Sequence, residues 1–318
     1  MRTMLRSAVW LAAATMAAAT VPVYTVGPAL QGAASQVSSE FETVVTLPSP
    51  APDTENLFEA PDGSIYITGM DAKVVWKVTP DRRVDTFASV PSVAYVVGVA
   101  STGDGFALTT FGRPFRRPGA PGQPPQVDFS DIDTRVILLD KAGQLTATIP
   151  GQKGQAFNGI TAAGTRAGLY LVADSNAGTI WQVDAAKKSI EPWLKDDVLA
   201  PTETVRVGAN GIKVHNGWVY VSSRGTMYRA EMGPNGRPQG TLSVFAQGIR
   251  TDDFDIAKDG TIYLSSMTKI SPRGEMSPFR EKVPTGPAVM VSRDGRWLYW
   301  PTRGGEGPQR LLRTAILP

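Results

Sequence analysis

The sequence of 318 residues contains no cysteine and a single histidine, His215. Without cysteine the chain can form no disulfide, no thiol nucleophile and no cysteine-based zinc site. One histidine excludes a three-histidine zinc centre. Its place in a His-Asn-Gly turn at 215–217, which we expect to be exposed, argues against a Ser-His-Asp triad and against histidine-dyad hydrolysis.

An excess of charge of one sign is also missing. Charged residues make up 19% of the chain, with 32 basic against 29 acidic side chains, and two of the basic ones, Arg2 and Arg6, stand at its beginning. There is no basic stripe, so the sequence predicts no nucleic-acid partner. We expect a monomer that binds a small-molecule substrate.

Residues 1–19 have the pattern of an export signal. Arg2 and Arg6 precede an apolar run of small residues at 7–19, and the alanines at 17–19 offer a cleavage site. A second candidate cut lies near residues 33–34, so we expect residues 1–34 to comprise a signal peptide and a flexible mature N-terminus. The alternative is an uncleaved membrane anchor, but the run is short and alanine-rich for a bilayer span. The sequence therefore predicts a periplasmic or secreted protein without membrane contact after signal removal.

Glycine and proline are frequent, at 32 and 25 residues, which suits a fold with many tight turns. Six segments repeat one unit, a short strand of β-forming residues that follows a glycine-containing turn. They lie at 64–68, 105–109, 168–172, 218–222, 261–265 and 296–300. Six repeats of three or four antiparallel strands predict an all-β fold, a six-bladed β-propeller over residues 41–318. A pair of β-sandwiches is the alternative, but it does not explain the polar residue ahead of each innermost strand.

Two segments stand outside this repeat. Residues 41–47 form a strand without a blade of its own, and we expect it to complete the last blade, because ring closure removes exposed sheet edges. Residues 112–134 form a Pro/Gly-rich insertion between the second and third strands of blade two. This connection emerges on the face where the innermost strands begin, so the insertion is a candidate lid. The alternative is a solvent loop without a role.

Four oxygen-bearing side chains precede hydrophobic strands at intervals that fit the repeat. They are Glu55, Asn158, Asn210 and Asp252. Repeated units place equivalent residues around a common axis, so the four predict an oxygen cage with two formal negative charges. Such a cage suits a divalent cation, calcium first, and leaves coordination places for water or substrate. The alternative is that the Asn-Gly pairs are only turns.

The segments around the two asparagines resemble a known family. Phe-Asn-Gly-Ile at 157–160 leads to Leu-Tyr-Leu-Val-Ala-Asp-Ser at 169–175, and Ala-Asn-Gly-Ile at 209–212 leads to Val-Tyr-Val-Ser at 219–222. This pattern is similar to the senescence marker protein/gluconolactonase family of six-bladed propellers. Strictosidine synthase-like proteins and diisopropyl fluorophosphatase share that architecture. The resemblance covers about residues 41–318.

In metal-dependent members of this family a Glu, two Asn and an Asp hold a catalytic calcium, and the resemblance assigns these roles to Glu55, Asn158, Asn210 and Asp252. The chain departs from the family pattern twice. Glu-Gly-Pro is replaced by Glu-Asn-Leu at 55–57, and Asp-Gly by Asp-Asp at 252–253. Asp253 is therefore an alternative ligand. We expect Asp255, further along, to support the site or to hold a second, structural cation.

The resemblance implies calcium-dependent hydrolysis of a lactone or related ester, in which the metal polarises the carbonyl and Asp252 or an activated water is base or nucleophile. The predicted rim residues, expected to bind substrate unless they are plain surface residues, are Arg113, Asp174, Arg224 and Arg303. The family also has non-hydrolytic members, and fold does not fix function. The alternatives are a condensing or rearranging enzyme of secondary metabolism and a binding scaffold with a structural cation.

Overall fold

The computed structural model describes residues 41–48, 53–113, 115–117, 126–128, 132–164, 166–280, 283–284, 286–303 and 308–316. The chain divides into two units, residues 1–38 and 39–318, and every described residue belongs to the second. The predicted signal peptide and mature N-terminus at 1–34 lie outside the described residues. Over the described ranges, none of the helical structure has the length and apolarity that a membrane span requires.

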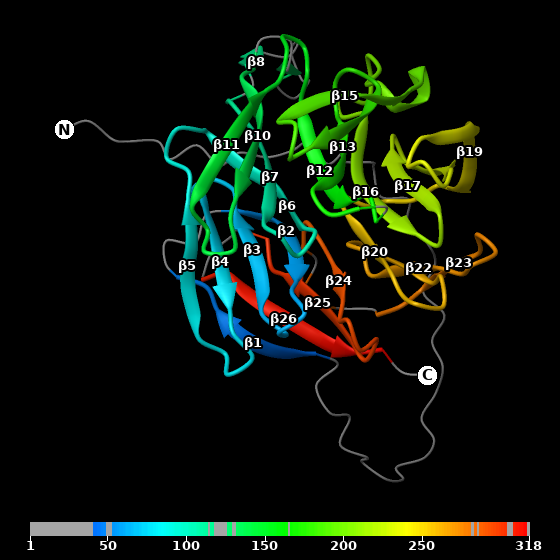
Figure 1. The fold of residues 1–318 in the computed structure, drawn as a ribbon. Helices are drawn as coiled ribbons and strands as arrows, with labels where there is room; N and C mark the ends of the chain where they lie inside the picture. The colour runs from blue at the N-terminus through cyan, green and yellow to red at the C-terminus, as the bar shows by residue number, and fades with distance from the viewer. Residues whose placement is uncertain are drawn as a thin grey trace, which may run out of the picture. The chain divides into compact units, whose positions relative to one another are not determined.

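Six four-stranded antiparallel sheets form the blades of a propeller (Figure 1). Blade one comprises β2 (Thr54–Glu59), β3 (Ile65–Gly69), β4 (Val74–Val78) and β5 (Val84–Ser89). Blade two comprises β6 (Tyr95–Ser101), β7 (Phe106–Phe111), β10 (Thr134–Leu139) and β11 (Leu145–Pro150). Blade three comprises β12 (Phe157–Ala162), β13 (Leu169–Asp174), β14 (Thr179–Asp184) and β15 (Ser189–Lys195).

Blade four comprises β16 (Ala209–His215), β17 (Trp218–Ser223), β18 (Thr226–Met232) and β19 (Pro238–Gln247). Blade five comprises β20 (Phe254–Ile256), β21 (Ile262–Leu264), β22 (Thr268–Ile270) and β23 (Met276–Pro278). Blade six comprises β24 (Met290–Val291), β25 (Trp297–Pro301), β26 (Arg310–Ala315) and β1 (Glu42–Thr46). The only helical element among the described residues is the 3₁₀ turn η1 (Asp197–Leu199). The predicted six-bladed propeller is confirmed.

The N-terminal strand closes the ring, as the sequence predicts. β1 pairs antiparallel with β26, with Glu42 opposite Arg313 and Thr46 opposite Arg310. The Arg313 guanidinium donates to the Glu42 carboxylate at 2.5 Å, which reinforces this register. Blade six therefore joins the beginning of the propeller to its end, and the outer edge of β26 is covered rather than exposed.

The insertion contains structure that the sequence did not predict. Strands β8 (Phe115–Arg117) and β9 (Gln126–Asp128) pair with each other as a two-stranded ribbon. The ribbon lies in the chain between β7 and β10, the second and third strands of blade two, as expected. A role as a lid stays a prediction.

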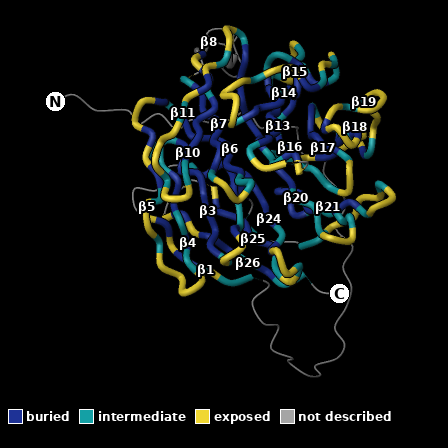
Figure 2. The backbone as a smooth tube through the Cα atoms, in the orientation of Figure 1, coloured by how far each residue is buried: buried dark blue, intermediate teal, exposed yellow. Residues whose placement is uncertain are grey.

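The core is formed by the faces on which neighbouring blades pack. Between blades one and two, Tyr66 is 5% exposed, and its ring lies 4.8 Å from that of Phe87 and 4.6 Å from that of Phe106. Burial is deepest on the inner strands, and the exposed residues gather on turns and outer strands (Figure 2). Tyr66 is therefore a packing residue, and the polar side chains at the propeller axis are the exception to explain.

Candidate metal centre at the propeller axis

The inner strands of blades one to four are interrupted at the same point. The pairing register shifts between Thr54 and Leu57, Val96 and Val99, Phe157 and Ile160, and Ala209 and Ile212. Each shift leaves two residues as a bulge, which re-aims their side chains. These pairs are Glu55-Asn56, Val97-Gly98, Asn158-Gly159 and Asn210-Gly211, and the corresponding pair before β20 of blade five is Asp252-Asp253. We call the two members of each pair the first and second bulge positions.

The first bulge positions include all four predicted cage residues. Blade two has Val97 there instead of a polar residue, which explains why Glu55 and Asn158 stand two blades apart in the sequence. The cage thus draws on blades one, three, four and five. The repeat that the sequence suggested is therefore structural: one bulge position recurs from blade to blade.

The second bulge positions lie where neighbouring inner strands approach most closely. A Cβ atom on Gly159 would lie 2.5 Å from the Asn210 carbonyl oxygen, and one on Gly211 would lie 2.5 Å from a carboxylate oxygen of Asp253. Glycine is therefore required in these blades by close approach rather than by turn geometry. Blades one and five differ, because Asn56 and Asp253 carry polar side chains at this position.

Hydroxyl groups on the second strands fix the bulges. The main-chain N–H of Asn56 donates to Thr68 Oγ1 at 2.9 Å, and the Thr68 hydroxyl donates to the Val97 carbonyl of the next blade at 2.8 Å. Thr109 repeats both contacts one blade further, with the Gly98 N–H and the Asn158 carbonyl. Each hydroxyl thus holds its own bulge and ties it to the next inner strand.

Blades four and five use serine to hold their own bulge segments. The N–H of Gly211 donates to Ser222 at 3.0 Å, and the N–H of Asp252 donates to Ser265 at 3.1 Å. The sequence patterns did not predict this set of hydroxyl groups, although a Thr or Ser does follow the repeated Tyr-bearing strand at 68, 222 and 265. In blade three, Ser175 replaces it, accepting from the Asn158 amide at 3.1 Å and donating to the Ala209 carbonyl at 2.8 Å.

Three of the four predicted ligands line one small recess at the axis. Glu55, Asn158 and Asn210 surround it, together with Val97 and second-position residues that include Asp253. Its volume is about 10 Å³, measured for the centre of a water-sized sphere, so it holds about one water or ion. The fourth predicted ligand, Asp252, does not line the recess but accepts a hydrogen bond from the Asn210 amide at 2.8 Å.

Asp252 is held from both sides. Its Oδ1 accepts from Asn210, and its Oδ2 accepts from the Arg303 guanidinium at 2.6 Å. The Asp252 side chain is 12% exposed, whereas that of Arg303 is 48% exposed. Arg303 is therefore the more mobile of the two partners.

Glu55 is an unusual carboxyl group for its position. Burial and the negative charge of Asp252 hold the pKa of Glu55 well above its ordinary value, and the Arg303 charge opposes this rise. Desolvation disfavours the ionised form of Glu55, and the neighbouring carboxylates repel its negative charge. A bound cation would relieve both effects.

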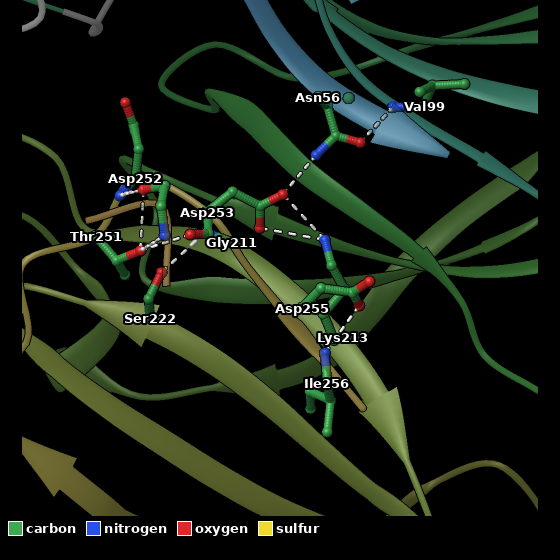
Figure 3. Close-up of polar contacts among 12 residues, drawn as sticks. Asn56, Val99, Gly211, Lys213, Ser222, Thr251, Asp252, Asp253, Asp255 and Ile256 are labelled. Atoms are coloured by element: carbon green, nitrogen blue, oxygen red, sulfur yellow. Dashed lines mark hydrogen bonds and ion pairs between the residues drawn. The ribbon is translucent and has the colours of Figure 1, made fainter. Parts of the chain in front are cut away.

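Asp253 faces the axis as well, one step further along the chain. It accepts from the Asn56 amide at 2.7 Å and from the Lys213 ammonium at 3.2 and 3.0 Å (Figure 3). Burial raises the pKa of Asp253, and Lys213 opposes this. The two neighbours thus have different partners, because Asp252 contacts Asn210 and Arg303 whereas Asp253 contacts Asn56 and Lys213.

Asp255 lies on β20 beside this pair. One carboxylate oxygen accepts from the Ile256 N–H at 2.9 Å, and the other from the Val291 N–H at 2.8 Å. Burial raises the pKa of Asp255 from 3.8 to about 6, although the charge of Lys213 lowers it. Asp255 therefore links blade five to blade six.

The other three predicted rim residues lie apart from these axial contacts. Arg113 is exposed, with its guanidinium 5.7 Å from the centre of the Tyr95 ring. Arg224 donates to the Val198 carbonyl at 3.1 Å, which ties it to η1. Asp174 is fully buried at the end of β13.

The Asp174 carboxylate accepts hydrogen bonds from its own blade, mainly from the turn that follows it. Its Oδ1 accepts from the N–H groups of Ala156, Asn176 and Ala177 at 2.8, 3.0 and 3.0 Å. Its Oδ2 accepts from the Trp181 indole at 3.0 Å. This geometry assigns the carboxylate to the β13–β14 connection and gives no support to a role in substrate binding.

His215, expected to be exposed, is partly buried, with its Nε2 3.0 Å from Asn216 Nδ2.

The donor set suits a divalent cation in its chemistry. Within the described residues, no three Asp, Glu, His or Cys side chains are grouped as metal ligands, so a cation here would depend on amide oxygens beside two carboxylates. The amide nitrogens of Asn158 and Asn210 are already used by Ser175 and Asp252. Their amide oxygens are the atoms left for ligation, and hard divalent cations accept such oxygens.

Comparison with solved structures defines the class of fold. The chain superposes on a gluconolactonase from Xanthomonas campestris with a TM-score of 0.60, 13% identity, and coverage of 86% of this chain and 88% of the other. A calcium-binding regucalcin from Agrobacterium tumefaciens gives 0.59 at 14% identity, with 87% and 94% covered. Virginiamycin B lyase from Staphylococcus aureus gives 0.55 at 10% identity, with 86% and 98% covered.

The sequence itself matches no protein-family model and no curated protein. At these low identities the structural likeness defines the fold alone: this chain has the six-bladed propeller architecture of gluconolactonase and regucalcin. The architecture expected from the resemblance is thereby confirmed. Because a lyase also superposes on this chain, the reaction must be argued from the axial residues.

Proposed function

We propose that the protein is a hydrolase of lactones or related esters that uses a divalent cation, calcium first among the candidates. The proposed ligands are Glu55, Asn158, Asn210 and Asp252. The observation that carries the proposal is that three of these side chains, from three blades, line one recess and that the fourth is hydrogen-bonded to the third. The gluconolactonase and the calcium-binding regucalcin of the same fold support it by analogy.

The charges near the axis support a cation. Carboxylates outnumber the basic groups that act on them, since Glu55 feels the charges of Asp53, Asp252 and Asp253 against that of Arg303. Lys213 offsets Asp253. A divalent ion would balance the remaining negative charge, and calcium affinity rises with the number of charged ligands.

When bound, the cation supplies Lewis-acid polarisation of the substrate carbonyl. Asp252 then acts as the base or nucleophile, in contact with the amide that orients it, Asn210. Arg303 covers Asp252 and is half exposed. An anionic or carbonyl oxygen of the substrate would draw the guanidinium away and leave Oδ2 of Asp252 free to accept a proton from water.

A non-hydrolytic propeller is the second candidate, either a condensing or rearranging enzyme or a binding scaffold. The observation that favours it is that Asp252 and Asp253 each have a cationic partner already, in Arg303 and Lys213. In such a protein any cation at the axis would be structural. The two proposals differ in whether ester or lactone bonds are broken.

The test is hydrolysis of a panel of lactones and esters by the purified protein after chelation and again after calcium is restored. We expect activity that chelation removes and calcium restores. Asp252→Asn should lower kcat/KM by roughly 100-fold or more, because a carboxylate base becomes an amide. The matched control, Glu191→Gln, changes a carboxylate 53% exposed on the surface and should be as active as wild type. Absence of hydrolysis across the panel, or hydrolysis unaffected by chelation and by Asp252→Asn, would reject the proposal in favour of the second candidate.

A further inference from the structure

A lysine lies among the acidic groups of the axis. Lys213 belongs to β16, three residues beyond Asn210, and its Nζ contacts both carboxylate oxygens of Asp253 at 3.2 and 3.0 Å. The Lys213 side chain is 17% exposed and that of Asp253 is 8% exposed. A largely buried, two-point contact of this kind differs from the exposed ion pairs elsewhere on the propeller.

The same ammonium serves a second carboxylate. Asp255 follows Asp253 by two residues, and residues two apart in a strand face the same side. Figure 3 shows Asp255 beside Lys213, and the charge of Lys213 acts on the Asp255 carboxyl group. One positive charge therefore faces two acidic groups of blade five, of which Asp253 is buried and Asp255 is partly buried.

Asn56 completes the arrangement from blade one. Its amide donates to Asp253 at 2.7 Å, and its Oδ1 accepts from the Val99 N–H of blade two at 3.3 Å (Figure 3). Lys213 supplies the contact from blade four. The inner strands of four blades are thus joined through the carboxylate of Asp253 and the amide of Asn56.

We propose that Lys213 is a built-in counter-cation, which occupies the place that a metal ion would take between Asp253 and Asp255. Its removal turns this pair of carboxylates into a divalent-cation site. The reason is that two neighbouring carboxylates without a counter-charge are costly in a largely buried place, and oxygen ligands of this kind bind hard divalent cations. This role goes beyond the proposed hydrolysis and does not depend on it. It also gives Asp255 a partner inside the chain, where the sequence suggested a second, structural cation.

The test compares Lys213→Met with wild type, because methionine keeps much of the aliphatic length and removes the charge. Lys187→Met is the matched control, since Lys187 is 76% exposed and its partner Asp184 keeps an ion pair with Arg166. Tm is measured in chelator and in excess calcium. Calorimetry counts the calcium ions bound per chain.

We expect the Tm of Lys213→Met in chelator to lie below that of wild type by on the order of 5–10 °C, with no change for Lys187→Met. In calcium, Lys213→Met should bind one more ion per chain than wild type and regain much of its Tm. The comparison with wild type makes the result independent of the hydrolase proposal: the variant gains one ion whether wild type binds none or one. Adding Asp253→Asn should abolish the additional ion.

An unchanged Tm of Lys213→Met in chelator overturns the proposal, and so does the absence of an additional bound ion. If Lys213→Met does not fold, the double variant Lys213→Met/Asp253→Asn carries the test, since both charges are removed together. A folded double variant that binds no more calcium than wild type supports the role of Lys213 as counter-cation. A double variant that also fails to fold overturns it.

Discussion

The two bulge positions are neighbours in the sequence, yet they balance charge in different ways. At the first position, the cation that acts on both Glu55 and Asp252 is Arg303, which is 48% exposed. At the second, Asp253 is paired with Lys213, which is 17% exposed. We propose that an exchangeable ion serves the first position, whereas at the second the chain supplies its own counter-charge, Lys213.

One repeated backbone feature therefore supports two roles. The bulge presents two successive side chains near the axis, and the glycines at the second position in blades two, three and four bring the strands close together. Where blades one and five lack this glycine, Asn56 and Asp253 bind each other instead. The cationic partners differ in exposure, and we infer that this difference sets which carboxylate is available to a ligand.

Loss of the Asp253 carboxylate should give the largest effect on stability. In Asp253→Ala, Lys213 becomes a largely buried charge without its partner, and breaking such a pair costs about 3–5 kcal/mol of unfolding free energy. The control Glu191→Ala breaks an ion pair with Arg237 that is about half exposed on both sides and should cost less than about 1 kcal/mol. Urea unfolding of both variants decides the matter. Equal costs would erase the distinction between the two positions.

The pH dependence of stability should show the buried acids. The pKa of Asp255 is raised to about 6 in the folded chain, so between about pH 4 and pH 6 the folded state binds more protons than the unfolded state. Stability is then greatest at the acidic end of this range and falls as pH rises, by up to about 3 kcal/mol for this group.

Urea unfolding from pH 4 to pH 6.5 in chelator measures this slope. Asp255→Asn, which cannot ionise, should have a shallower slope than wild type. Burial also raises the pKa values of Glu55 and Asp253, which should leave part of the slope in the variant. Stability that rises with pH over this range, or a slope of stability against pH that is unchanged in Asp255→Asn, would contradict the account.

The hydroxyl ties between blades should have a smaller effect. Thr109→Val removes the acceptor of the Gly98 N–H and the donor to the Asn158 carbonyl, at a cost of about 1–3 kcal/mol for buried groups left unpaired. Thr148 is exposed on the outer strand β11, so Thr148→Val is the matched control and should be nearly neutral. Thermal unfolding compares the two. The account of the bulge fails if the two variants melt alike.

The fold could be predicted from the sequence because its signals are local. Each blade carries a glycine turn before a β-rich strand, and residues 41–47 had no other sheet to join. That Glu55, Asn158, Asn210 and Asp252 occupy equivalent positions could be predicted for the same reason, since the first bulge position recurs at the spacing of the blades. The exception in blade two, Val97, appeared in the sequence only as a longer interval.

The partners of the cage could not be predicted, because they depend on contacts between blades. Alternation along a strand gives no warning that Lys213 reaches Asp253, since the bulge changes the alternation just before it. Asp174 looked like a rim residue because its place at the end of a strand was visible, whereas its four donors were not.

The most direct test of the central claim is calcium binding to Glu55→Gln, measured by calorimetry beside wild type and the surface control Glu191→Gln. Glu55 lines the axial recess, and its replacement removes one of two proposed carboxylate ligands without touching Lys213. The account predicts one calcium ion per chain for wild type and the control, and an affinity at least about 10-fold lower for Glu55→Gln. Absence of binding in wild type, or an equal affinity in Glu55→Gln, would contradict it.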